Sequence, residues 1–183
     1  MNIYFIDDEN IKRDEIQLFM DYFIELKNST VYWVNEKGEP EEEPYYCQAE
    51  YEATDEFLEK IGELSNEEDL FFVDMALNQK ERIDSGRFDK DDPPVFKAST
   101  CGKILKALLN KNEKCKAYVV SSIHGIGRNN KWIDAIRSEL PQELVTSAFI
   151  QDRFLHYETI NDADGYLDYF EEKLGLHACD ESS

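Results

Sequence analysis

The sequence of 183 residues predicts an α/β fold, in which an open parallel sheet of five strands carries helices on both faces. Two observations predict this fold. Short unbroken apolar runs, typical of parallel strands that are buried on both faces, recur along the chain. Segments with apolar residues at helical spacing alternate with these runs, and right-handed crossover connections place such helices on the two faces of a sheet.

The first strand is expected over residues 3–6, an apolar run that ends at Asp7 and Asp8. Residues 11–27 follow with helical spacing, and Asn10 is placed to cap that helix. The β-rich residues 30–34 predict the second strand. A polar stretch with Gly38, Pro40 and Pro44 follows and is expected to break regular structure.

Thr54 is expected to cap a helix that runs to Leu64, and the apolar residues 70–73 predict a third strand that ends at Asp74. Residues 78–97 show no sustained period, and loops of that length are usually functional or mobile. The remaining elements are a helix that starts at Ser99 or Thr100, a strand over 117–120, a helix over 132–140, a strand over 145–150 and a last helix over 166–174.

Length and composition favour one domain over residues 1–175, followed by a short tail over 176–183. Residues 36–53 and 78–97 are expected to be insertions in this domain. The formal net charge of −20 argues against direct binding to nucleic acid or to anionic membranes. The start of the chain is typical neither of a signal peptide nor of a membrane span, so we expect a cytoplasmic protein with reduced, mostly structural cysteines.

Polar side chains follow three of the expected strands where they end. Asp7 and Asp8 follow the first strand, Asp74 the third, and Ser121 the fourth. In open parallel sheets the ligand site lies outside the carboxyl ends of the strands, so these side chains are expected to converge.

Carboxylates that converge need a cation or a raised pKa, because two like charges about 4 Å apart repel by roughly 4 kcal/mol at an effective dielectric near 20. Mg²⁺ is the natural candidate, since it prefers oxygen ligands and leaves positions for phosphate oxygens. A carboxylate held in such a site can also act as a nucleophile toward phosphorus.

Three segments carry a family resemblance: Ile-Tyr-Phe-Ile-Asp-Asp-Glu at 3–9, Asp-Leu-Phe-Phe-Val-Asp at 69–74 and Ala-Tyr-Val-Val-Ser-Ser at 117–122. In these segments the sequence resembles the receiver domain of two-component response regulators. The resemblance implies a flavodoxin-like sheet with the strand order 2-1-3-4-5. It also implies a signalling domain that is not an enzyme, with a histidine kinase or phosphotransfer protein upstream and an unknown protein downstream; the oligomeric state stays open.

The resemblance further implies a role for each site residue. Asp74 is similar to the phosphoacceptor, and Asp7 and Asp8 are similar to the metal-binding pair that holds Mg²⁺ together with Asp74. Ser121 is similar to the switch hydroxyl, and Phe149 occupies the position of the aromatic switch residue.

The chain departs from the receiver pattern after the fifth expected strand, where receivers carry a lysine that pairs with the phosphoryl group. Asp152 stands at that position, and Arg153 is the candidate substitute for the lysine. Two alternatives to a phosphorylated receiver therefore stay open. One is an interaction module of receiver type without phosphorylation, and the other is a Mg²⁺-dependent phosphohydrolase, which the absence of a D-x-D pattern disfavours.

Overall fold

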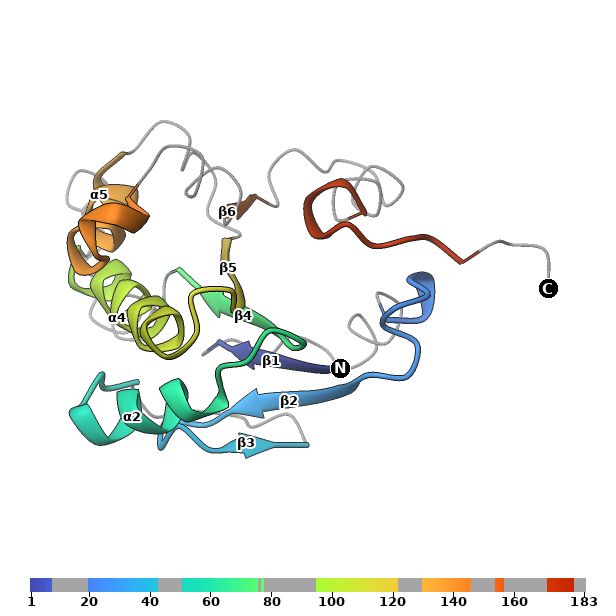
Figure 1. The fold of residues 1–183 in the computed structure, drawn as a ribbon. Coiled ribbons are helices and arrows are strands. Elements are labelled where there is room, and N and C mark those ends of the chain that lie inside the picture. The colour runs from blue at the N-terminus through green and yellow to red at the C-terminus, as the bar shows by residue number, and fades with distance from the viewer. Residues whose placement is uncertain are drawn as a thin grey trace, which may run out of the picture.

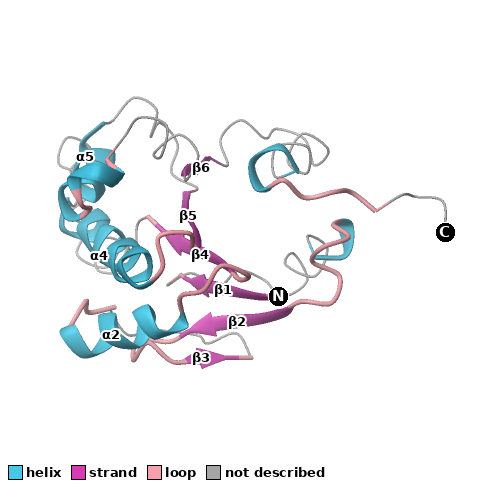
Figure 2. Cartoon of the chain, viewed as in Figure 1, coloured by secondary structure: helices cyan, strands magenta, loops and turns pink. Residues whose placement is uncertain are grey.

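The computed structural model of the chain describes residues 1–7, 20–42, 51–75, 77, 95–121, 130–145, 154–156 and 171–179. Within them it is an α/β structure built on one sheet (Figures 1 and 2). The strands are β1 (Asn2–Ile6), β2 (Thr30–Val34), β3 (Pro40–Glu41), β4 (Leu70–Asp74), β5 (Lys116–Ser121) and β6 (Phe154–His156). The helices are α2 (Asp55–Leu64), α4 (Val95–Lys111), α5 (Asn130–Glu139) and the short 3₁₀ helix η2 (Gln142–Leu144).

The strands lie in the order β3-β2-β1-β4-β5-β6. All neighbours in this sheet are parallel except β2 and β3, which are antiparallel. The expected strands at 3–6, 30–34, 70–73 and 117–120 are all present. Among themselves they are neighbours in the expected way, since β1 lies between β2 and β4, and β5 follows β4.

The sheet differs from the expected one at both edges. It has six strands because β3, inside the expected insertion 36–53, adds an antiparallel edge to β2. The other edge strand is β6, whereas the sequence predicts a strand over 145–150. The apolar residues Leu144 and Val145 instead follow Pro141 in and after η2, where they pack against the core. Residues 146–150 lie outside the described residues.

Two expected helix boundaries are also wrong. Helix α4 begins at Val95, directly after two prolines, rather than at Ser99 or Thr100, so the expected loop 78–97 is shorter at its end. Ser99 and Thr100, expected as capping residues, instead lie within the helix. The helix expected over 11–27 ends at Tyr22, because Phe23 forms a β-bridge with Ala178.

The sheet is buried on both faces, with alternate residues of each strand on opposite sides. On one face Ile6, Phe71 and Val119 pack under α2, α4 and α5. On the other face Phe5 and Phe72 pack under residues 20–26 and 174–176. Figure 1 shows the three helices on one side of the sheet and the second set of segments on the other.

Helix α2 begins where the sequence predicts it, because the Thr54 hydroxyl accepts a hydrogen bond from the N–H of Phe57 at 3.2 Å. Helices α4 and α5 cross closely at Gly102. A Cβ there would lie 3.0 Å from the Ile136 carbonyl oxygen, so a larger residue would crowd this contact.

The expected tail packs against the chain in its first four residues. Leu176 is buried, the His177 carbonyl accepts from the N–H of Ile24 at 2.9 Å, and the N–H of Cys179 donates to the Tyr22 carbonyl at 2.8 Å. Residues 176–179 are therefore part of the second face. Among the described residues, the structure contains no helix with the length and apolar character needed to cross a membrane.

Candidate functional site

The carboxyl ends of β1, β4 and β5 lie at one edge of the sheet. Ile6 of β1 pairs with Val73 of β4, so the next residues along the same register are Asp7 and Asp74. Asp74 pairs in turn with Val120 of β5, and Ser121 follows it. Neighbouring strands lie about 4.8 Å apart, and residues in register on parallel strands project to the same face. The register thus sets the chain at Asp7 beside Asp74 at this edge, with the main chain of Ser121 one strand further along.

The other residues assigned to the site fall outside the described residues. They are Asp8, Phe149 and Arg153, together with Asp152 at the expected lysine position. Their roles remain predictions from the sequence.

Helix α4 contacts the site electrostatically through Cys101. This thiol is fully buried, and its pKa is raised well above the usual range, mainly by burial and in addition by the negative charge of Asp74. The thiol therefore stays protonated, and it behaves as an apolar core group.

Tyr51 is a buried residue at this edge that the sequence did not point to. Its hydroxyl oxygen lies 2.5 Å from the Val34 carbonyl oxygen and 3.3 Å from the Asp7 carbonyl oxygen. Its ring packs edge-on against Phe57 of α2, with the ring centroids 6.0 Å apart. Tyr51 thereby connects the ends of β1 and β2 to helix α2.

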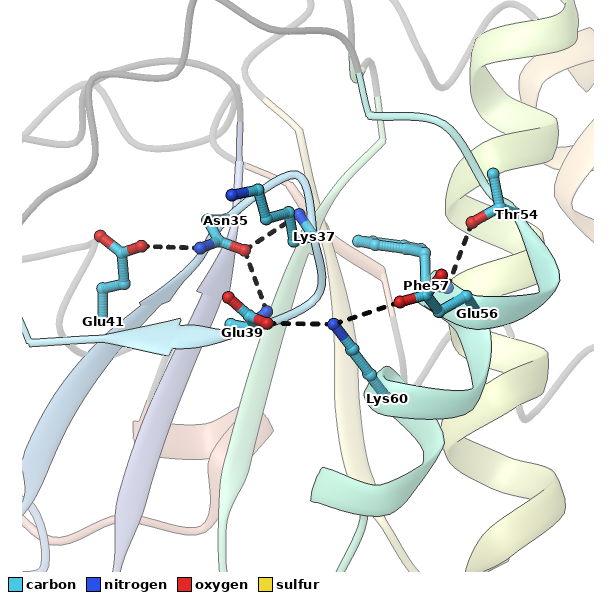
Figure 3. Close-up of polar contacts among 8 residues, drawn as sticks. All are labelled: Asn35, Lys37, Glu39, Glu41, Thr54, Glu56, Phe57 and Lys60. Atoms are coloured by element: carbon cyan, nitrogen blue, oxygen red, sulfur yellow. Dashed lines mark hydrogen bonds and ion pairs between the residues drawn. The ribbon is translucent and has the colours of Figure 1, made fainter.

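A tight hairpin follows β2 at the same edge and is organised by the buried side chain of Asn35 (Figure 3). The side-chain oxygen of Asn35 accepts from the N–H of Lys37 at 2.9 Å and of Glu39 at 3.0 Å, and its amide donates to Glu41 at 2.6 Å. Gly38 adopts a φ of 78°, a conformation that favours glycine at such a turn. These contacts turn the chain back from β2 into β3.

The hairpin is attached to α2 by Lys60. Its ammonium lies 3.0 Å from a carboxylate oxygen of Glu39 and 3.6 Å from one of Glu56 (Figure 3). The hydrogen bond between Lys60 and Glu39 raises the pKa of the lysine and lowers that of the glutamate. The pair of Lys60 and Glu39 adds a surface contact between the hairpin and the helix.

The donor set at the edge fits a hard divalent cation. Asp7 and Asp74 offer carboxylate oxygens, the ligands that Mg²⁺ prefers, and Mg²⁺ commonly binds through one or two carboxylates with water in its other positions. In the described part of the chain, no three His, Cys, Asp or Glu side chains form a group that could hold a metal ion. A Mg²⁺ site that combines Asp7 and Asp74 with Asp8 stays a prediction from the sequence.

Comparison of the chain with protein-family models, with curated proteins and with solved structures gave no match.

Proposed function

We propose that the chain is a signalling domain of receiver type with a flavodoxin-like sheet, which accepts a phosphoryl group on Asp74. The observation that carries the proposal is the register of β1 and β4, which sets Asp7 beside Asp74 at the carboxyl edge of the sheet. The neighbour relations of β2, β1, β4 and β5 support it, as does the position of α2, α4 and α5 on one face.

In the proposed reaction, a carboxylate oxygen of Asp74 attacks phosphorus in a phosphohistidine or in a small acyl phosphate. An O–P bond to Asp74 forms and the bond from phosphorus to the donor breaks. A histidine donor leaves as an imidazole that takes up a proton, and an acyl phosphate leaves as a carboxylate. Mg²⁺ held by Asp7, Asp8 and Asp74 would supply positive charge against the phosphoryl oxygens.

Three further residues serve the proposed switch. The hydroxyl of Ser121, the last residue of β5 at this edge, would donate a hydrogen bond to a phosphoryl oxygen. Phe149 and Arg153 would complete the response, with Arg153 in place of the usual lysine. The added charge at Asp74 would then shift the equilibrium between two surface states that a downstream protein distinguishes.

Intact mass spectrometry after incubation with acetyl phosphate and Mg²⁺ tests the proposal. The wild-type chain should gain the mass of one phosphoryl group, and hydroxylamine should remove it, as expected of an acyl phosphate. Asp74→Asn should gain none. Asp69→Asn, a change at the opposite end of the same strand, is the matched control and should be phosphorylated like the wild type in the folded protein.

A mass gain of equal size in Asp74→Asn would refute the assignment of the phosphoacceptor. If the folded wild type gains no mass, the second candidate function is favoured, an interaction module of receiver type that works without phosphorylation. Asp152 at the expected lysine position is the observation that favours this candidate.

A further inference from the structure

The ends of β1 and β2 are held together by a side chain from a distant part of the sequence. The paired residues of the β1–β2 ladder end with Phe5 and Trp33. Beyond this pair, the Tyr51 hydroxyl lies within hydrogen-bonding distance of the Val34 carbonyl at 2.5 Å and the Asp7 carbonyl at 3.3 Å. One hydroxyl proton shared between two carbonyls is a three-centre bond, in which the shorter contact takes the larger part.

Tyr51 is itself fixed in place from two sides. Its side chain is 3% exposed, and its ring lies against Phe57 in the first turn of α2. The backbone after Tyr51 is closed by a hydrogen bond from the N–H of Thr54 to the Glu52 carbonyl at 2.8 Å, immediately before Thr54 caps the helix. The hydroxyl is therefore presented by a rigid ring rather than by a mobile loop side chain.

We infer that Tyr51 is a positioning residue of the candidate cation site, where its hydroxyl holds the main chain at Asp7 in the conformation that binds Mg²⁺. The inference rests on the proposed function, because it assigns Asp7 to the cation. It also gives part of the expected insertion 36–53 a role in the site. Tyr51 acts through the backbone of Asp7 and touches neither the cation nor the phosphoryl group.

A group that fixes a metal ligand before Mg²⁺ binds should change the affinity for Mg²⁺ more than it changes the rate of phosphorylation. Loss of one hydrogen bond to the main chain at Asp7 should weaken Mg²⁺ binding roughly 3- to 10-fold. At saturating Mg²⁺ the cation itself restores the conformation of Asp7, so the rate of phosphorylation should return to the wild-type value.

The test compares Tyr51→Phe with Tyr32→Phe. Both variants remove a phenolic hydroxyl and keep the ring, and Tyr32 lies on β2, stacked on Tyr4 with the ring centroids 5.3 Å apart. Phosphorylation by acetyl phosphate is followed over a series of Mg²⁺ concentrations. Hydrogen exchange of the peptide 1–8 is measured without Mg²⁺, and circular dichroism confirms that each variant folds.

The expected result is a Mg²⁺ midpoint raised roughly 3- to 10-fold in Tyr51→Phe, with a wild-type rate at saturation and faster exchange in the peptide 1–8. Tyr32→Phe should match the wild type in its Mg²⁺ midpoint, in its rate at saturation and in the exchange of the peptide 1–8. An unchanged midpoint in Tyr51→Phe, with normal phosphorylation of the wild type, would overturn the inference and leave the proposed function standing.

Hydrogen exchange distinguishes two further outcomes, in which either the inference about Tyr51 or the proposed cation site fails. If exchange in the peptide 1–8 is unchanged in Tyr51→Phe, the hydroxyl does not position Asp7 and the inference fails whatever happens to phosphorylation. If exchange rises but the wild type shows no dependence on Mg²⁺, the cation site of the proposed function is refuted, and with it the binding role given to Tyr51.

Discussion

The two ends of β4 carry the same side chain in different surroundings. Asp69, just before the strand, is 7% exposed, and its carboxylate accepts from the N–H of Asn2 at 2.6 Å. It also accepts from the side-chain amides of Asn2 at 3.2 Å and of Asn66 at 2.8 Å. At the other end, Asp74 is half-buried and the residue next to it in register is a second acid, Asp7.

The difference separates an acid whose partners are N–H donors of the same chain from an acid that lies next to a second acid in the register. At the amino edge, N–H donors from the same chain compensate the charge of Asp69 and tie the starts of β1 and β4 together. At the carboxyl edge, the register places one negative charge beside another, which favours a bound cation. Strand ends that look alike in the sequence therefore have different electrostatic surroundings at the two edges of the sheet.

The largest expected effect on stability is at the amino edge. Asp69→Ala should lower the free energy of unfolding by about 2–4 kcal/mol, because three donors lose their acceptor where water is largely excluded. Urea denaturation followed by circular dichroism measures this loss, with Asp74→Ala as the control. An equal loss in both variants would remove the distinction between the two edges.

The hairpin after β2 gives a smaller effect and shows that the carboxyl edge has a structural residue of its own. Asn35→Ala removes three hydrogen bonds of a buried side chain and should cost about 1–3 kcal/mol of unfolding free energy. Asn35→Asp is the informative partner variant, since it keeps the acceptor for the N–H groups of Lys37 and Glu39 but places a carboxylate against Glu41. Asn35→Asp should therefore also lose unfolding free energy in urea denaturation. A loss in Asn35→Ala alone would contradict this role of Asn35 in the turn.

At the carboxyl edge itself, Asp74→Asn should leave stability unchanged or raise it by up to about 1 kcal/mol in the absence of Mg²⁺. The reason is that one of two neighbouring like charges is removed. Thermal unfolding with and without Mg²⁺ checks this, and Mg²⁺ should stabilise the wild type more than the variant. Strong destabilisation of Asp74→Asn without Mg²⁺ would instead place Asp74 in the structural class of Asp69.

The smallest effect on stability is expected at the exposed pair of His177 and Glu25, which lies outside both edges of the sheet. His177 Nδ1 lies 2.6 Å from a Glu25 carboxylate oxygen, and the N–H of His177 donates to the other oxygen at 3.0 Å. The hydrogen bonds from the backbone and side chain of His177 lower the pKa of Glu25 to about 2. The hydrogen bond with Glu25, and to a lesser degree the charge of Glu171, raises the pKa of His177.

The sign of the pH dependence follows from these directions. The contribution of His177 is complete below its usual pKa of 6.5 and is lost as the pH rises through its raised value. The contribution of Glu25 is present above its usual pKa of 4.5 and is lost as the pH falls toward about 2. An NMR titration should show the raised pKa of His177 and its return toward 6.5 in Glu25→Gln; a titration that does not change in this variant would contradict the pairing.

Most of the sheet could be predicted because its central strands are buried on both faces, and burial of that kind leaves a continuous apolar run in the sequence. The helix cap at Thr54 could also be predicted from the sequence, since it depends on two residues that are three positions apart. The candidate site at the carboxyl edge followed from the same strands, since β1 and β4 are neighbours in the register that the pairing of Ile6 with Val73 shows. The roles of Asp7 and Asp74 stay predictions.

The parts that were missed depend on contacts that leave no local pattern. Strand β3 exists because the Asn35 side chain and Gly38 turn the chain back, whereas one glycine and two prolines in the sequence indicate only a break in regular structure. The apolar residues Leu144 and Val145 serve core packing rather than a strand. Tyr51 contacts a carbonyl 44 residues away in sequence, and its neighbours are acidic residues that predict an exposed segment.

The hairpin that closes β2 also bears on how the protein behaves when it is crowded. The described sheet ends on this side in a strand of two residues, Pro40 and Glu41, of which the first has no N–H to offer a further strand. Glu39 and Glu41 add negative charge along the same border, and short, charged edges with proline discourage pairing between sheets of different molecules. This border should therefore resist growth into intermolecular sheets in concentrated solution.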